Sequence, residues 1–212
     1  MTRTYWDHWL STLKKEEPGV DMRFLRRLLE NSISTILDIG SGYGSSSRSL
    51  AQLGFRVTCA DYSSEAVQYL KEASRILIRG HMDVVCADAL FLPFRDESFG
   101  AATSLMMMNF FIDEPERKHA FSEIFRVVEK DGIMLFMVLS DDDEGMTGGT
   151  PMGNHNVRHP DGLCLHYYTM NELEDLLAPM YLEEIERFRQ EDVTHGDPHA
   201  HDLIRVLASR RK

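Results

Sequence analysis

The sequence predicts an α/β fold with a doubly wound, mainly parallel sheet. A short apolar run at 36–39 is followed by a glycine-rich turn and by a segment that can begin a helix. Six further strand-like segments follow, most of them separated by helix-like segments. The length of 212 residues fits one α/β domain with a complete hydrophobic core.

Composition argues against several classes of protein. The chain has 34 acidic and 23 basic residues, a net charge of −11, so we expect no nucleic-acid partner. No run approaches the ~18 apolar residues of a membrane span, and the charged first 20 residues do not resemble a signal peptide. Three cysteines, an odd number, favour a reducing cytoplasmic location.

Two amphipathic helices are predicted before the first strand. Aromatic and aliphatic residues recur at helical spacing in 5–13 and again in 24–29, and Pro18-Gly19 separates the two segments. These helices form a predicted N-terminal cap over residues 1–32.

The stretch 35–44 is the motif around which the other elements are organised. Gly40, Gly42 and Gly44 follow the first strand and can let a ligand lie directly on the main chain, facing the N–H groups of a helix start. A dinucleotide fingerprint places its third glycine one residue later, where this chain has Ser45. Asp38 stands two residues before Gly40, and its carboxylate suits a cofactor with a cationic end.

The second and third predicted strands both end on an aspartate. The strand at 55–60 ends on Asp61, 21 residues after Gly40, where a carboxylate can accept both ribose hydroxyls of an adenosyl group. Capping of the next helix is the simpler role for Asp61. The strand at 82–87 ends on Asp88.

The remaining elements continue the alternation of strands and helices. We expect a helix that begins near Asp113 and another at 169–177, which starts with the capping box Thr169-Met170-Asn171-Glu172. A turn-rich connection is expected at 192–201. The remaining strands are expected at 101–105, 133–139, 181–189 and 203–208.

The motif Leu37-Asp38-Ile39-Gly40-Ser41-Gly42-Tyr43-Gly44 resembles the first motif of class I S-adenosylmethionine-dependent methyltransferases. Residues 88–99 resemble the third motif of that family, although Gly100 stands where the family usually has Asp. The resemblance covers 33–139 well and the remaining chain only in architecture. It implies a Rossmann-like seven-stranded sheet with an antiparallel last strand, and methyl transfer from S-adenosylmethionine to a small-molecule acceptor.

The resemblance also implies roles for single residues. Tyr62 would lie against the adenine, and Asp88 would meet the adenine amino group. Together with the residues argued above, the predicted cofactor-binding set is Asp38, Gly40, Ser41, Gly42, Gly44, Asp61, Tyr62, Asp88, Ala89 and Leu105.

We expect a single methyltransferase domain, monomeric or homodimeric. It would comprise the cap at 1–32, a cofactor-binding core at 33–139 and a substrate side at 140–212. For the cap, two roles remain open: packing at the edge of the domain, or a lid over the cofactor, as in related methyltransferases.

Residues 140–168 are predicted to be a long functional loop. Six of nine histidines lie in 155–166 and 195–201, and the family topology would bring both segments to the substrate face. They have three interpretations: polar loop residues, a general base or substrate clamp, or a metal site of His195, His199 and His201 near the acidic run 141–144. No spacing reproduces a known zinc pattern, so no metal ligand is assigned. The catalytic candidates are Tyr5, His155, His159, His166, His195 and His199.

Two alternative functions remain open. A metal-assisted O-methyltransferase would use acidic residues after the fourth and fifth strands, with Asp113 and Asp141 as candidates. A binding protein would hold the cofactor without turnover. No Asn-Pro-Pro-Tyr-like segment follows the strand at 101–105, which disfavours methylation of a nucleobase amine.

Overall fold

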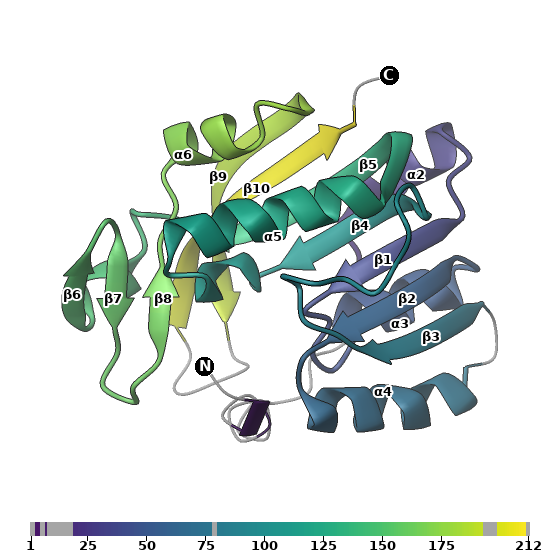
Figure 1. Cartoon of the computed structure of the whole chain (residues 1–212), viewed down its shortest axis with the longest axis horizontal. Helices are drawn as coiled ribbons and strands as arrows, with labels where there is room; N and C mark the ends of the chain where they lie inside the picture. Colours follow the sequence, from purple (N-terminus) through teal and green to yellow (C-terminus); the bar gives the residue numbers. More distant parts are fainter. Residues whose placement is uncertain (1–2, 5–6, 8–18, 78–79, 193–198, 211–212) are drawn as a thin grey trace.

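A seven-stranded sheet forms the centre of the molecule, in the order β3-β2-β1-β4-β5-β10-β9 (Figure 1). The computed structural model describes residues 3–4, 7, 19–77, 80–192 and 199–210. The strands are β1 (Thr35–Ile39), β2 (Arg56–Asp61), β3 (His81–Cys86), β4 (Phe99–Leu105), β5 (Val128–Leu139), β9 (Tyr181–Asp192) and β10 (His199–Ser209).

The direction of the strands confirms the predicted fold class. β1 pairs in parallel with β2 and β4, while β3 and β5 extend the parallel pairing on either side. β10 runs antiparallel to both of its neighbours, β5 and β9. The strand order reverses at β1, and the crevice beyond the carboxyl ends of β1 and β4 is where such folds bind ligands.

Helices cover both faces of the sheet. One face packs against α5 (Glu114–Val127) and α6 (Met170–Leu176), and the other packs against α2 (Met22–Glu30), α3 (Ser45–Gln52) and α4 (Ser64–Arg75). β1 serves both faces, because Ile36 packs on the α3 side while Leu37 and Ile39 pack on the α5 side. This alternation is the period of two expected for a strand.

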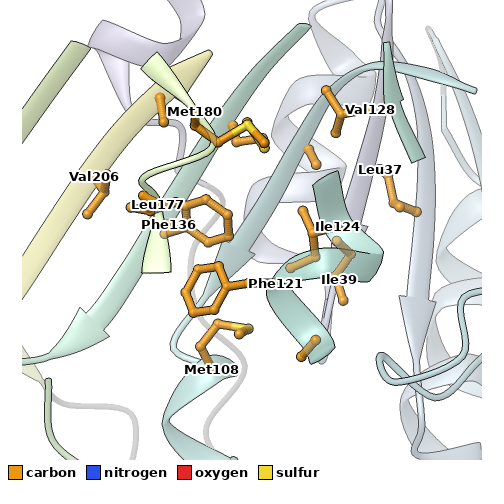
Figure 2. Packing of buried hydrophobic residues seen from close by; sticks show 14 of the residues in the cluster. Leu37, Ile39, Met108, Phe121, Ile124, Val128, Phe136, Leu177, Met180 and Val206 are labelled. Atoms are coloured by element: carbon orange, nitrogen blue, oxygen red, sulfur yellow. The ribbon is translucent and has the colours of Figure 1, made fainter. Parts of the chain in front are cut away.

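Aliphatic side chains surround two aromatic rings, those of Phe121 and Phe136, in the core beneath α5 (Figure 2). Phe121 on α5 and Phe136 on β5 are each 1% exposed, and their ring centroids are 5.0 Å apart. Met108, in the short 3₁₀ helix η1 (Met108–Phe110), is fully buried in the same cluster. The methionine run after β4 thus supplies a core residue directly beside the predicted ligand crevice.

The segment 140–168 is not the long loop that was expected. It contains a 3₁₀ helix, η2 (Glu144–Thr147), and a second, antiparallel sheet of β6 (Thr150–Gly153), β7 (Asn156–Arg158) and β8 (Cys164–His166). These strands are three or four residues long, too short to show a period-two pattern. Burial of Val157 and Tyr167 against Leu139 and Leu203 holds this sheet on the main one.

The connection expected at 192–201 is also shorter than predicted. β9 continues to Asp192, β10 begins at His199, and these two residues pair directly. Backbone pairing has therefore overridden the weak strand propensity of Asp192 at the end of β9.

The predicted helix at 5–13 lies almost entirely outside the described residues, as does Tyr5. Of the described N-terminal residues, Arg3 and Asp7 contact the start of α4. Asp7 accepts hydrogen bonds from the Ser63 and Ser64 hydroxyls at 2.6 and 2.7 Å, while Arg3 Nε donates to the Tyr62 carbonyl at 2.9 Å. Among the helices of the described chain, none is long and apolar enough to cross a membrane.

Candidate active site

The glycine loop between β1 and α3 has a backbone shape that favours glycine. Gly40, Gly42 and Gly44 all have positive φ, at 69°, 52° and 71°. A Cβ on Gly40 would lie 2.3 Å from Met107 Cγ, so a side chain there would collide with the segment after β4. The main chain of the loop therefore lies close to the carboxyl end of β4.

Asp61 connects the glycine loop to the start of α4. Its carboxylate accepts one hydrogen bond from the backbone N–H of Gly42 and another from that of Ser63, both at 2.8 Å. Desolvation raises the pKa of Asp61, and these backbone donors partly oppose the rise. The N-cap of α4 is Ser63, so Asp61 does not cap this helix and instead accepts from the backbone N–H of the capping residue. Each carboxylate oxygen of Asp61 retains capacity for a further donor.

Asp38 lies beneath the loop and is 3% exposed. Thr103 Oγ1 on β4 donates to it at 2.7 Å, and Ser47 Oγ on α3 donates through a shorter hydrogen bond. Burial raises the pKa of Asp38, and the two hydroxyls oppose that shift. Both oxygens are engaged inside the protein, so in this structure Asp38 positions β1, α3 and β4 relative to one another.

The other predicted cofactor residues lie at neighbouring strand ends. Tyr62 follows β2, and the Arg3 guanidinium lies 4.9 Å from the centroid of its ring. Asp88 follows β3, where its carboxylate accepts a hydrogen bond from Leu90 N at 2.9 Å. Ala89 and Leu105 are half-buried, the latter as the last residue of β4.

The residues at these strand ends fit S-adenosylmethionine. Ser41 Oγ in the loop is buried and has no hydrogen-bond partner among the described residues. Neutral hydroxyl and backbone N–H donors hold Asp38 and Asp61. An ammonium or a sulfonium nearby would favour the charged form of both carboxylates.

His166, a catalytic candidate, is 1% exposed and bonded through both ring nitrogens. Nδ1 is 2.8 Å from Asn156 Oδ1, and Nε2 is 2.9 Å from Glu172 Oε2. Arg117, itself buried, donates to Glu172 at 3.0 Å. Burial lowers the pKa of His166, although Glu172 opposes the change.

Glu172 shows why the predicted capping box is only half formed. Its backbone N–H donates to Thr169 Oγ1 at 3.0 Å, as the motif requires. Its carboxylate binds His166 and Arg117 instead of turning back to the helix start.

His159 and His201 lie at the two ends of another polar group. Nε2 of His159 is 2.9 Å from the hydroxyl of Tyr167, and Nδ1 of His201 is 2.9 Å from Asp143 Oδ2. A Cβ added to Gly145 would touch both the Tyr167 hydroxyl and Asp143 Oδ1, so these two groups lie close together. Histidines of the two predicted segments therefore approach each other here.

His155 is exposed and lines a different hollow, together with His166. This pocket of about 680 Å³ lies between α5 and α6. Arg117, Glu172, Phe121 and Leu176 also line it, and none of the predicted cofactor residues does. The candidate histidines are thus divided between two places.

The remaining candidates are less informative. His195 lies outside the described residues. Asp113 is exposed, and Asp141 binds Arg187 at 2.6 Å. In the described part of the chain, neither aspartate belongs to a group of three possible metal ligands. Sequence reasoning missed Asp7 and Asp192, and it considered Asp143 only as part of the acidic run 141–144.

A family profile described as a methyltransferase domain matches residues 37–136. In structure, the chain is similar to a SAM-dependent methyltransferase from Methanosarcina mazei, with a TM-score of 0.76 and 23% identity. That likeness covers 87% of this chain and 97% of the other. Residues 37–136 thus match a methyltransferase domain, and the chain has the fold of S-adenosylmethionine-dependent methyltransferases. The methyl donor of this domain family is S-adenosylmethionine.

Curated relatives match over parts of their length. The tRNA (carboxymethyluridine(34)-5-O)-methyltransferase of Arabidopsis thaliana is 30% identical over 152 residues, which are 68% of this chain and 34% of the relative. The demethylmenaquinone methyltransferase of Thermobifida fusca is 33% identical over 106 residues, 50% of this chain and 43% of the relative. The chain therefore spans between a third and a half of these two relatives.

We expect Asp61→Ala to weaken binding of S-adenosylmethionine to the methyltransferase domain by about 1–3 kcal/mol, because buried donors lose their acceptor. Isothermal titration calorimetry measures the change. Asp61→Asn keeps the shape of the side chain but removes its charge and turns one of the two acceptor oxygens into an amide donor. Asp83→Ala, at an exposed aspartate on β3, is the control. Unchanged affinity in a folded Asp61→Ala variant would remove Asp61 from the site.

The lowered pKa of the buried His166 also predicts a pH-dependent stability. As pH falls below ~6.5 the unfolded chain takes up a proton that the folded chain refuses, so stability falls by up to about 1.4 kcal/mol per pH unit. We expect His166→Gln to be less stable than the wild type at pH 8, and the difference to narrow as pH falls. Urea unfolding at pH 8, 6.5 and 5 gives the free energy of unfolding of both proteins. If the difference in free energy between them is the same at all three pH values, the lowered pKa of His166 is contradicted.

Proposed function

We propose that this protein transfers the methyl group of S-adenosylmethionine to a small-molecule acceptor, as a single-domain cytoplasmic enzyme, monomeric or homodimeric. The observation that carries the proposal is the pair of hydrogen bonds that the Asp61 carboxylate accepts from the backbone N–H groups of Gly42 and Ser63. They place a carboxylate at the carboxyl end of β2, directly beside a glycine loop with positive φ. That is the place for an adenosyl ribose in the methyltransferase resemblance stated above.

The residues of the chain would act mainly by binding and orientation. Bound S-adenosylmethionine supplies an activated methyl group on a sulfonium, so alignment of the acceptor and exclusion of water are the main requirements. Asp61 and the Ser41 hydroxyl would bind polar groups of the cofactor. Arg3 and Asp7, which contact Tyr62 and the start of α4, support the lid role for the N-terminal segment.

The acceptor would bind where segments 140–168 and 199–202 meet the carboxyl ends of β4 and β5. Ser140 N donates to the Asp202 carbonyl, which joins these segments directly beyond β5. The net charge of −11 favours a small molecule over a polynucleotide. Among the relatives, the name demethylmenaquinone methyltransferase supports a small-molecule acceptor, whereas the name of the tRNA methyltransferase supports a polynucleotide acceptor.

A panel of acceptors tests the proposal. The purified chain is incubated with methyl-labelled S-adenosylmethionine and small phenols, quinols, amines and thiols, and separately with total tRNA. We expect S-adenosylhomocysteine and labelled product with a small acceptor and not with tRNA. Labelled tRNA would overturn the acceptor class. Cofactor binding without turnover on any acceptor would favour the binding-protein alternative.

If a histidine acts as general base, turnover at saturating cofactor should fall below a pH near 6.5 while cofactor affinity stays constant. We expect His159→Asn to lower kcat by about 100-fold or more. His155→Asn reports on the separate pocket between α5 and α6. If both folded variants turn over at the wild-type rate, positioning of the acceptor is the contribution of this face.

A further inference from the structure

The end of the β9–β10 hairpin brings three possible metal ligands together. Asp192 on β9 pairs with His199 on β10, and His201 follows His199 by two residues. Alternate residues of a strand share one face, and cross-strand partners are the closest neighbours on that face. Backbone pairing therefore gathers the three side chains, and one ligand atom from each lies within 4.8 Å of the others.

The separations are close to those of a metal site. Nε2 of His199 is 3.0 Å from Nε2 of His201, which is 3.7 Å from Asp192 Oδ2. Zinc bonds of 2.0–2.1 Å at tetrahedral angles place ligand atoms about 3.3 Å apart. The two separations lie on either side of this value. His199 is exposed and Asp192 half-buried, so small rotations of their side chains would bring all three atoms onto one ion.

Asp143 orients the central histidine. Its side chain is 1% exposed, and Oδ2 accepts both His201 Nδ1–H at 2.9 Å and the backbone N–H of Asp202 at 2.8 Å. With Nδ1 donating to a carboxylate, Nε2 is directed at His199 and Asp192. A carboxylate behind the outer nitrogen of a histidine is the usual support of a metal-bound imidazole.

We propose that Asp192, His199 and His201 bind one divalent transition-metal ion, with Asp143 as the positioning residue for His201. Two imidazoles and one carboxylate suit zinc and its neighbours, whereas Mg²⁺ and Ca²⁺ take oxygen ligands. Three protein ligands leave a coordination position for water or another small ligand. The acidic run 141–144, considered from the sequence, contributes through Asp143 alone, as a partner of His201.

The site would be separate from the cofactor site. β10 is three strands away from β1, which at ~4.8 Å per strand is about 14 Å. Leu203 pairs with Leu139, the last residue of β5, so the ligands lie beyond the carboxyl end of β5. The ion would therefore face the acceptor side of the sheet, and cofactor affinity is not expected to depend on it.

Metal titration of the full chain tests this proposal. After treatment with a chelator and dialysis, the protein is titrated with Zn²⁺ by calorimetry, and with Co²⁺ as a spectroscopic probe. We expect one saturable site, with an absorption spectrum showing nitrogen and oxygen ligands for Co²⁺, and far weaker binding of Mg²⁺. His199→Asn and Asp192→Asn should each weaken Zn²⁺ binding by at least about tenfold, and Asp143→Asn by about 10- to 100-fold.

His81→Asn is the matched control, because His81 is an exposed histidine beside an aspartate on β3, the opposite edge of the sheet. It should bind Zn²⁺ like the wild type. His199 is exposed, so His199→Asn should fold normally, as its thermal unfolding will show. Equal Zn²⁺ affinity in this variant and the wild type, or no saturable binding, would overturn the proposal. Calorimetric titration of His199→Asn with S-adenosylmethionine measures cofactor affinity in the same variant. Failure of the metal proposal can then be distinguished from failure of the cofactor site.

Discussion

The buried carboxylate of Asp38 is the constraint on which the cofactor half of the structure depends. A carboxylate inside a protein is costly unless donors surround it. Here the donors are hydroxyls of Ser47 on α3 and Thr103 on β4, so one side chain joins three elements. The loop between β1 and α3 has little freedom once its two ends are held in this way.

Asp61 completes the same arrangement from the neighbouring strand. It accepts hydrogen bonds from the backbone N–H of Gly42, the middle glycine of the loop, and from that of Ser63, the N-cap of α4. The loop, the end of β2 and the start of α4 are therefore positioned together, and the N-terminal residue Asp7 binds the same helix start. A ligand at this edge would meet groups that are already oriented, which lowers the entropic cost of binding.

The part of the structure after β5, from residue 140 onward, is built differently, from short segments that are held by polar contacts. His166, Glu172, Arg117 and Asn156 form one buried network behind the small sheet, and Asp143 and His201 join η2 to the β9–β10 hairpin. Such fully bonded networks specify one arrangement because any member left unpaired would be costly. The two halves meet at the carboxyl edge of one sheet, where methyl transfer and metal binding would occupy neighbouring but separate places.

The sequence by itself determined the strands and helices of the main sheet and the glycine motif, because these depend on local patterns. Apolar runs, the spacing of Gly40, Gly42 and Gly44, and an aspartate after the second and third strands are all visible within short windows. Only the tertiary structure decided how the segments after β5 are arranged. β6, β7 and β8 are too short for periodicity, and Asp192 becomes a neighbour of His199 and His201 only when β9 and β10 pair. Contacts between residues far apart in the chain depend on register and burial, which no local pattern records.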